Sequence, residues 1–332
     1  MTDTAAPALP ANASTQGIVR KVMAMVIVAV LLYGGYTVYV GAAKIAEALS
    51  HFQWWTFGAA CTLAFANYLL RFLKWEFYLA RLEIRGIPKL ESLLIFLSGF
   101  VLTVTPGKVG EVFKSALLAE RHQIPIARTA PIVIADRVTD VIGIAVLIAI
   151  GSAGFAGGLV WALIGLGLVA TLLIVVGSRT LSLGIIGLVE RGPGPCKRIA
   201  PKLAEAYEAL AILVSPKNLV LPAVISIGAW LLECMALWVI LHGFGQTTAI
   251  PLCLFFYATS TLAGAIVPTP GGLGVTETLL EQGLTKLGHV SDIFATAAMI
   301  LVRFATLWFA VLVGFVALTL LRGRPVEART GL

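Results

Sequence analysis

The chain has 332 residues, of which 59% are hydrophobic and only 12% are charged. Soluble domains carry roughly a quarter charged residues, so this composition, with a mean hydropathy of +0.95, excludes an ordinary soluble protein. The net charge of +7 is explained by cytoplasmic loops that are rich in Lys and Arg. No motif of aromatic and basic residues indicates nucleic-acid binding. The four cysteines and four histidines are scattered, so no disulfide framework, metal site or cofactor is predicted.

Long apolar runs divide the chain into membrane-crossing helices. About twenty apolar residues cross a ~30 Å hydrocarbon core as a helix. In chain order, the sequence predicts crossing helices at Val19–Val40, Trp54–Leu79, Pro131–Gly151, Gly158–Val176, Leu219–Leu241 and Asp292–Leu321.

Two further apolar stretches are interrupted by proline and glycine. Leu93–Thr105 is followed by Pro106-Gly107 and a second stretch, Val109–Leu118. Leu252–Val267 is followed by a Pro-Thr-Pro-Gly-Gly segment and a half-helix, Val275–Leu287. The first stretch reaches only about 20 Å at 1.5 Å per residue, which is too short to span the membrane. Each is therefore half of a broken crossing helix or one arm of a re-entrant hairpin.

The distribution of basic residues favours hairpins. With two hairpins that return to their own side, most of the 24 Lys and Arg residues fall in cytoplasmic segments, Lys74 and Lys114 among them. Two full crossings would move the basic segment 177–218 outside, against the positive-inside rule. We predict an all-α, polytopic membrane bundle of about six crossing helices plus two re-entrant hairpins. It is expected in a bacterial inner membrane, multi-pass, with both termini cytoplasmic.

The predicted organisation is a single transmembrane domain, residues 19–321, between a polar N-terminal tail (1–18) and a C-terminal tail (322–332). Within it, residues 54–151 and 219–321 form two repeats, and residues 177–218 form a basic cytoplasmic loop. Apolar residues recur at helical spacing late in this loop. They predict an amphipathic helix that lies in the headgroup region or packs against the end of the bundle; they are Leu203, Ala206, Tyr207, Leu210, Leu213 and Val214.

The interrupted stretches share a motif. Both read Thr-Pro-Gly-x-x-Gly followed closely by glutamate; the motif residues are Pro106, Gly107, Gly110 and Glu111 in the first copy, and Pro270, Gly271, Gly272, Gly274 and Glu277 in the second. Three predicted crossings separate the copies, so the repeats are expected to be inverted. Inverted repeats with broken helices are typical of secondary transporters, whose substrate site lies near the membrane midplane.

The turns have a physical reason to bind anions. Proline ends a helix and glycine lets backbone approach closely, so the next helix would begin inside the membrane with unpaired N–H groups and a positive dipole end. Such an end is a ready anion site, and Lys108 would add positive charge. The alternative is a tightly packed helix break without a ligand.

Charged residues inside apolar helices form the second candidate feature. A charge at the bilayer centre costs at least about 2.5–3.5 kcal/mol. Arg137 and Asp140 lie three residues apart, beside Asp136, and either pair with each other or face a ligand. Arg303 has no nearby acid in sequence, so it needs a partner from another helix or from a ligand. A further pair, Arg71 and Glu233, is placed to meet across the repeat axis. Glu111 and Glu277 are placed to stabilise the half-helix N-termini or to carry protons.

These segments resemble the transmembrane region of lysylphosphatidylglycerol synthases, a family of flippase-like membrane proteins. The matching motifs are Pro-Gly-x-x-Gly-Glu at 106–111, Asp-Arg-x-x-Asp at 136–140 and Pro-x-Pro-Gly-Gly-x-Gly-x-x-Glu at 268–277. The similarity runs from about Met23 to Leu321. It implies a role in handling lipids, and because the chain ends at Leu332 we expect no C-terminal aminoacyltransferase domain.

The leading functional hypothesis is a flippase or scramblase-like transporter of a phosphate-bearing anionic lipid or lipid-linked precursor. Its partner would be that lipid, with lipid-synthesis enzymes as further candidates. The predicted binding residues are the nine motif residues given above together with Arg71, Lys108, Asp136, Arg137, Asp140, Glu233 and Arg303. Two alternatives are a secondary transporter of a small anion and an intramembrane lipid-modifying enzyme. The sequence lacks the nucleophile or metal pattern that such an enzyme needs.

Overall fold

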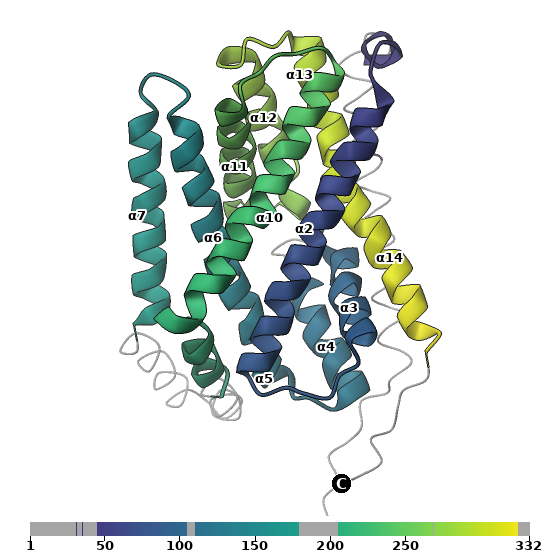
Figure 1. The fold of residues 1–332 in the computed structure, drawn as a ribbon, viewed down its shortest axis with the longest axis vertical. Helices are drawn as coiled ribbons and strands as arrows, with labels where there is room; N and C mark the ends of the chain where they lie inside the picture. Colours follow the sequence, from purple (N-terminus) through teal and green to yellow (C-terminus); the bar gives the residue numbers. More distant parts are fainter. Residues whose placement is uncertain are drawn as a thin grey trace, which may run out of the picture.

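The computed structural model describes residues 45–104, 110–178, 205–267 and 269–324, together with Leu31 and Gly35. Every regular element in this part of the chain is a helix (Figure 1). The elements are α2 (Trp54–Arg81), α3 (Lys89–Ser98), η1 (Gly99–Leu102), α4 (Gly110–His122), α5 (Ile126–Thr129), α6 (Pro131–Ser152), α7 (Gly158–Gly177), α10 (Pro216–Gly243), α11 (Ile250–Ile266), η3 (Pro270–Gly272), α12 (Val275–Lys286), α13 (Asp292–Arg303), η4 (Phe304–Trp308) and α14 (Phe309–Arg322). The predicted all-α helical bundle is confirmed.

Three helices are long and apolar enough to cross a membrane: α2, α10 and the continuous rod Asp292–Arg322 that α13, η4 and α14 form. Two shorter helices, Gly158–Ile174 and Ile250–Ile266, are also apolar. α6 has 22 residues, but three of them are charged. These helices are those of a multi-pass membrane protein. The first predicted crossing helix, Val19–Val40, lies outside the described residues apart from Leu31 and Gly35.

The helix ends follow local chemistry. Proline occupies the first turn of α6, α10 and α11, where its missing N–H costs no hydrogen bond. The observed bounds lie within four residues of the predicted ones. The largest differences are the end of α4, at His122 instead of Leu118, and the start of α3, at Lys89, directly after Pro88, instead of Leu93. Hydropathy overlooked the first turn of α3 because that turn contains Lys89 and Glu91.

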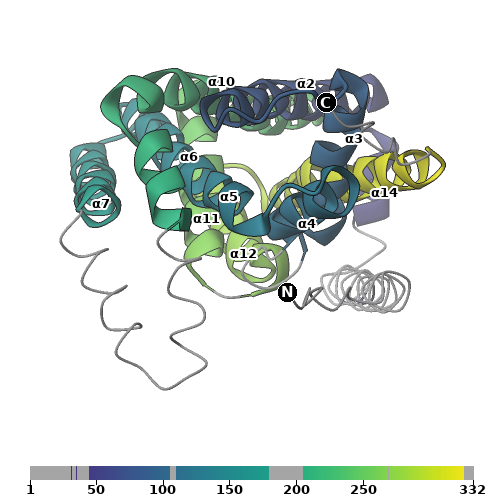
Figure 2. The ribbon, with the colours of Figure 1, turned by 90° about the horizontal axis from the view of Figure 1, so that it is seen from below.

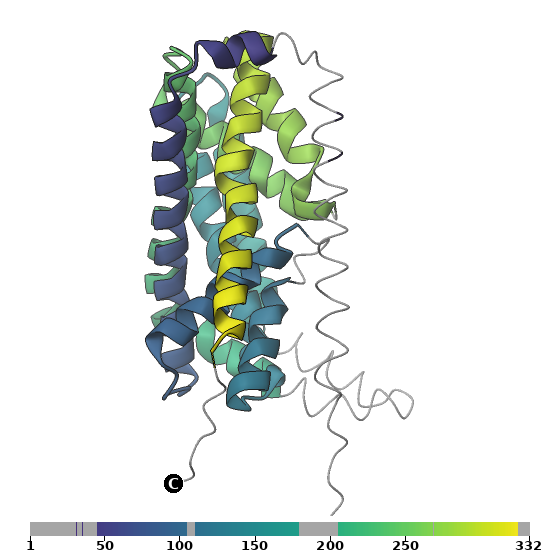
Figure 3. The same ribbon diagram turned by 90° about the vertical axis from the view of Figure 1, so that its right-hand side faces the viewer.

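Two pairs of short helices occupy opposite ends of the bundle. α3 and α4 lie in its lower half, and α11 and α12 lie in its upper half (Figures 1 and 3). Within each pair the two helices pack against each other. The turns that end α3–η1 and α11 point toward the middle of the molecule, where Val104 approaches Gly271. The motif residues Pro106, Gly107 and Lys108 lie outside the described residues, as do the side chains of Gly110 and Glu111.

Two hydrophobic clusters hold the bundle together. One joins α10, α11, α12 and α13 in the upper half, and the other joins the second half of α2 with α3, α4 and α14. α2 and α10 run side by side, whereas α7 lies at the periphery against α6 (Figure 2). Gly143 allows α6 to approach α10 closely, because a Cβ there would lie 2.9 Å from the backbone of Ser226.

The end of the predicted basic loop is helical at residues 205–213. Ala209 and Leu213 are buried in the lower hydrophobic cluster, and Leu210 and Val214 pack against it. Of the two alternatives for this segment, packing against the end of the bundle is the one that the structure shows. Most of the loop lies outside the described residues.

Candidate functional site

A cluster of charged side chains joins α2 to α6 near the middle of the bundle. Arg71 Nη2 lies 3.0 Å from Asp136 Oδ2 and 2.9 Å from Asp140 Oδ2. Lys74 Nζ lies 2.7 Å from Asp136 Oδ1 and 2.8 Å from Asp140 Oδ1. Arg137 Nη2 is 3.2 Å from Asp140 Oδ2, so the predicted i, i+3 pair forms. Helical spacing puts both cations on one face of α2 and both carboxylates on one face of α6.

Lys74 is the most deeply buried member of this cluster, with no exposed surface. Besides the two carboxylates, its ammonium group donates to Ser226 Oγ at 2.7 Å and to Thr139 Oγ1 at 3.3 Å. The sequence placed Lys74 in a cytoplasmic segment, and the structure corrects this by burying its side chain within the helix bundle. Lys114 was placed in a cytoplasmic segment too, yet it is buried between the rings of Trp75 and Phe96. Buried cations of this kind persist only when fully partnered.

Arg303 ends α13 and anchors the second glycine-rich turn. Its Nε lies 2.6 Å from Glu277 Oε1, and its Nη2 donates to the Gly271 carbonyl at 2.8 Å. Glu277 also accepts the Gly274 N–H at 2.7 Å, so it caps the start of α12. The partner that Arg303 was predicted to need from another helix is thus Glu277, and Glu277 stabilises the helix N-terminus.

The second turn depends on glycine. Gly271, Gly272 and Gly274 have φ of 61°, 73° and 87°, a backbone conformation that strains residues with a Cβ. Space is also short, because a Cβ on Gly264 would collide with Thr276 Oγ1. The turn therefore lets α11 and α12 nearly touch where the chain reverses.

Two tyrosines tie α2 and α11 to the rod that contains Arg303. Tyr68 donates to the Thr306 carbonyl at 2.8 Å. The Tyr257 hydroxyl donates to Glu233 at 2.8 Å and also lies 3.2 Å from Thr306 Oγ1. Thr306 lies in η4, a turn of π-helix. Such turns often occur at functional sites, because they free backbone groups from the regular ladder.

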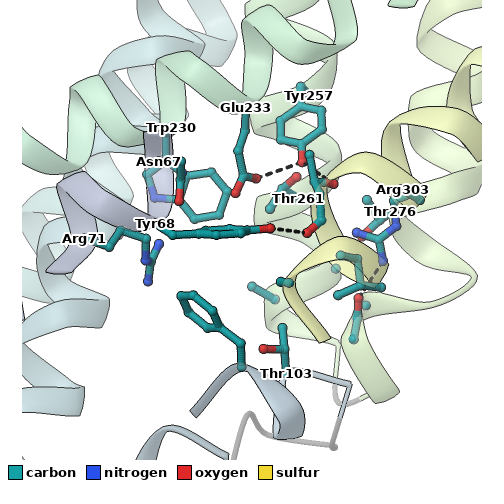
Figure 4. A pocket seen from close by; sticks show the side chains of 18 of the residues that line it. Asn67, Tyr68, Arg71, Thr103, Trp230, Glu233, Tyr257, Thr261, Thr276 and Arg303 are labelled. Atoms are coloured by element: carbon teal, nitrogen blue, oxygen red, sulfur yellow. Dashed lines mark hydrogen bonds between the residues drawn. The ribbon is translucent and has the colours of Figure 1, made fainter. Parts of the chain in front are cut away.

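A cavity of about 110 Å³ lies between these groups (Figure 4). It is bounded by α2, η1, α6, α10, α11, η3, α12 and the rod of α13, η4 and α14. The lining includes three arginines and one carboxylate: Arg71, Arg137, Arg303 and Glu233. Its aromatic and hydroxyl groups are Tyr68, Phe100, Trp230, Tyr257, Thr103, Thr261, Thr276 and Thr306. The cavity therefore presents cationic and hydrogen-bonding groups inside an apolar bundle.

Several lining atoms are buried without a hydrogen-bond partner in the described part of the chain: Asn67 Oδ1, Trp230 Nε1 and Thr261 Oγ1. Asn67 is held in place by its amide nitrogen, which donates to the Ala229 carbonyl at 2.7 Å. Buried polar atoms in native proteins are nearly always paired. Three such residues line this one cavity, which makes it the candidate site for a polar ligand.

The structure brings most predicted site residues to this cavity or next to it. The residues that line it are Arg71, Arg137, Glu233, Gly271, Gly272 and Arg303. The carboxylates of Asp136, Asp140 and Glu277 form ion pairs with these arginines. The ion pairs that the structure gives Arg71 go to the two aspartates, while Glu233 binds Tyr257. Sequence reasoning missed Lys74, Asn67, Tyr68, Trp230 and Tyr257. The spacing of Lys74 from Arg71 was a usable signal, whereas single polar residues in apolar helices gave none.

Comparison with known proteins bears on this arrangement. No curated protein matches the chain. The family model described as the lysylphosphatidylglycerol synthase TM region matches residues 25–314, which covers nearly all of the described helices. The chain belongs to the lysylphosphatidylglycerol synthase transmembrane-region family.

Proposed function

We propose that the protein moves a phosphate-bearing anionic lipid, or a lipid-linked precursor, between the leaflets of the membrane. The observation that carries the proposal is the cavity where Arg71, Arg137 and Arg303 converge from three different helices. Arginine pairs with phosphate through a planar fork of N–H donors. Family membership supports a lipid as the source of the phosphate, since the family is the membrane region of lipid-modifying synthases.

Charge balance indicates how such a ligand would bind. Four cations, Arg71, Lys74, Arg137 and Arg303, lie close to four carboxylates, Asp136, Asp140, Glu233 and Glu277. The resting network is therefore balanced without a ligand. An entering phosphate competes with carboxylates for guanidinium groups, and Arg137 is the most accessible, with 31% of its side chain exposed. A balanced network binds reversibly, as a transport cycle requires.

The helix pairs supply the moving parts of the proposal. Both pairs reach the middle of the bundle from opposite ends, and Val104 of the first approaches Gly271 of the second. Paired broken helices that enclose a central site are the common design of secondary transporters. In this proposal the pairs are re-entrant hairpins of an inverted repeat, and their separation opens the cavity to one leaflet at a time.

The cavity volume favours one competing function, transport of a small soluble anion. Pockets that enclose a drug-sized ligand measure roughly 300–1,000 Å³, whereas this cavity measures about 110 Å³. It holds a headgroup or a small anion, but not lipid tails. A lipid would have to leave its tails in the bilayer while its headgroup enters.

Proteoliposomes test the proposal. Movement of tail-labelled phosphatidylglycerol between leaflets is measured for the native chain, Arg137→Gln and Arg303→Gln. Each substitution should slow movement by about 10- to 100-fold, because a charged hydrogen bond contributes about 1.5–3 kcal/mol. Arg322→Gln, at the exposed end of α14, is the matched control and should keep the native rate.

The outcomes separate the alternatives. No lipid movement, together with uptake of phosphate or sulfate, would establish the soluble-anion transporter instead. Recovery of chemically altered lipid would establish an enzyme. Equal rates in the native chain and both arginine variants would show that the lipid does not pass through the cavity.

A further inference from the structure

A pair of unpartnered atoms beside the arginines points to the chemistry of the ligand beyond its phosphate. Asn67 Oδ1 is a hydrogen-bond acceptor and Trp230 Nε1 is a donor, and neither has a partner in the described part of the chain. Asn67 has no exposed surface and Trp230 is 6% exposed. Leaving such atoms unpaired in a buried site is unfavourable. Both belong to residues that line the cavity.

The two residues lie side by side. The Asn67 amide nitrogen donates to the carbonyl of Ala229, the residue directly before Trp230. Figure 4 shows both side chains on the same wall of the cavity. A single group that reaches this wall can therefore serve both atoms.

This wall is adjacent to the cationic part of the site. Asn67 is one helical turn before Arg71 on α2, and Trp230 is nearly one turn before Glu233 on α10. The Arg71 guanidinium lies 5.8 Å from the centre of the Trp230 ring, so a phosphate bound at Arg71 would lie next to that ring. The substituent attached to such a phosphate would then reach Asn67 and Trp230.

The donor and acceptor requirements select one type of substituent. A phosphate oxygen only accepts hydrogen bonds and an ammonium group only donates them, whereas a hydroxyl does both. A hydroxyl can donate to Asn67 Oδ1 and accept from Trp230 Nε1 at once. We infer that the site takes a hydroxylated phosphate ester, and that Asn67 and Trp230 select it through its hydroxyl group. The inference rests on the proposed function and names the class of its ligand.

Two labelled lipids of equal charge test this selection. Phosphatidylglycerol carries two hydroxyls in its headgroup, and phosphatidylpropanol has the same three-carbon headgroup without them. Leaflet movement of the two tail-labelled lipids is compared in proteoliposomes. The native chain should move phosphatidylglycerol at least about tenfold faster, because phosphatidylpropanol leaves both buried hydrogen bonds unmade.

Variants assign the preference to the two residues. Trp230→Phe keeps an aromatic ring but removes the N–H, and Asn67→Leu removes the acceptor. In each, the ratio should fall toward one, because one of the two hydrogen bonds to the hydroxyl is removed. Trp161→Phe, on the exposed surface of α7, is the control and should preserve the ratio. Trp230→Phe alone suffices if Asn67→Leu, which also loses the bond to Ala229, fails to fold.

The failures of the two ideas are distinguishable. Equal native rates for both lipids would overturn the hydroxyl inference and leave the proposed function standing. Movement of neither lipid would overturn both. Soluble glycerol phosphate, added to the same vesicles, identifies the source of the ester. If it slows phosphatidylglycerol in the native chain but not in Trp230→Phe, the hydroxyl site also accepts the soluble ester; no effect, with the lipid preference intact, assigns the site to lipid.

Discussion

Lys74 shows how strongly a single buried charge constrains this site. Its ammonium group lies within 2.8 Å of both Asp136 and Asp140 and has no exposed surface. Removing one partner of a buried charge network leaves the remaining charges unbalanced in a medium of low dielectric constant. The cation is therefore needed for the packing of α2 on α6, whatever its part in binding.

Replacing Lys74 by methionine should lower the free energy of unfolding by about 3–5 kcal/mol. The measurement is an unfolding titration of the purified protein in mixed micelles. Lys89→Met is the matched control, because Lys89 pairs with Glu76 at a site where 80% of its side chain is exposed. The control should change stability by less than about 1 kcal/mol. A loss of similar size in both variants would show that burial of Lys74 is not what matters.

From the sequence, the charged residues of this site were easier to predict than the neutral ones. Arg71, Arg137 and Arg303 stood out because a charge in an apolar run is costly and needs a reason. Tyr68 and Trp230 did not, because aromatic residues are common in membrane helices. Lys74 was assigned to the cytoplasm because hydropathy alone places it near the end of its helix. Only the fold shows that α6 carries two carboxylates opposite it.

At the scale of elements, glycine in the turn between α11 and α12 can be required for two reasons. Either the backbone conformation or the lack of space excludes a side chain. Gly274 has φ of 87°, and nothing lies within 4 Å of the position that a Cβ would take, so only strain opposes a side chain there. Gly272 has φ of 73°, and a Cβ would also lie 2.8 Å from Thr276 Oγ1. The two positions separate the two effects.

Gly274→Ala should destabilise the protein by about 1–3 kcal/mol through its positive-φ backbone alone, because residues with a Cβ rarely adopt this conformation. Gly272→Ala should cost more, since Thr276 must also move. Gly58→Ala in the first half of α2, where nothing lies within 4 Å, should instead stabilise by about 0.5–1 kcal/mol. Thermal unfolding of the three variants in one detergent checks the order. Equal effects at Gly58 and Gly274 would contradict the conformational explanation.

Helix bounds were predictable because proline, glycine and long apolar runs act locally. Pro131 begins a helix where the sequence predicted it, whereas α10 begins at Pro216, three residues before the predicted start at Leu219. The hydropathy pattern also separated the short helices α11 and α12 from the crossing ones. The π-helical turn at Phe304–Trp308 had no such signal, because its sequence is as apolar as its neighbours. Thr306 in this turn accepts a hydrogen bond from Tyr68 and lies next to the Tyr257 hydroxyl, and both tyrosines lie on other helices.

For the whole molecule, the decisive contact is the one between the two pairs of short helices. Val104, at the end of the first pair, is buried against Leu307 and Val311, with Leu273 of the second pair packed on the same cluster. This contact lies next to the cavity, which Thr103, Gly271 and Leu307 line. If the two helix pairs must separate during transport, a covalent link between them should stop transport.

A disulfide between Val104→Cys and Leu273→Cys, at two positions that share this cluster, would provide that link. The four native cysteines, Cys61, Cys196, Cys234 and Cys253, are first replaced by alanine so that the new pair is the only one. Oxidation should abolish leaflet movement of phosphatidylglycerol, and reduction should restore it. The single Val104→Cys variant, treated in the same way, should keep its rate. Full activity of the cross-linked protein would mean that the pairs stay together throughout the cycle, and that the lipid reaches the arginines by a path on another side of the cavity.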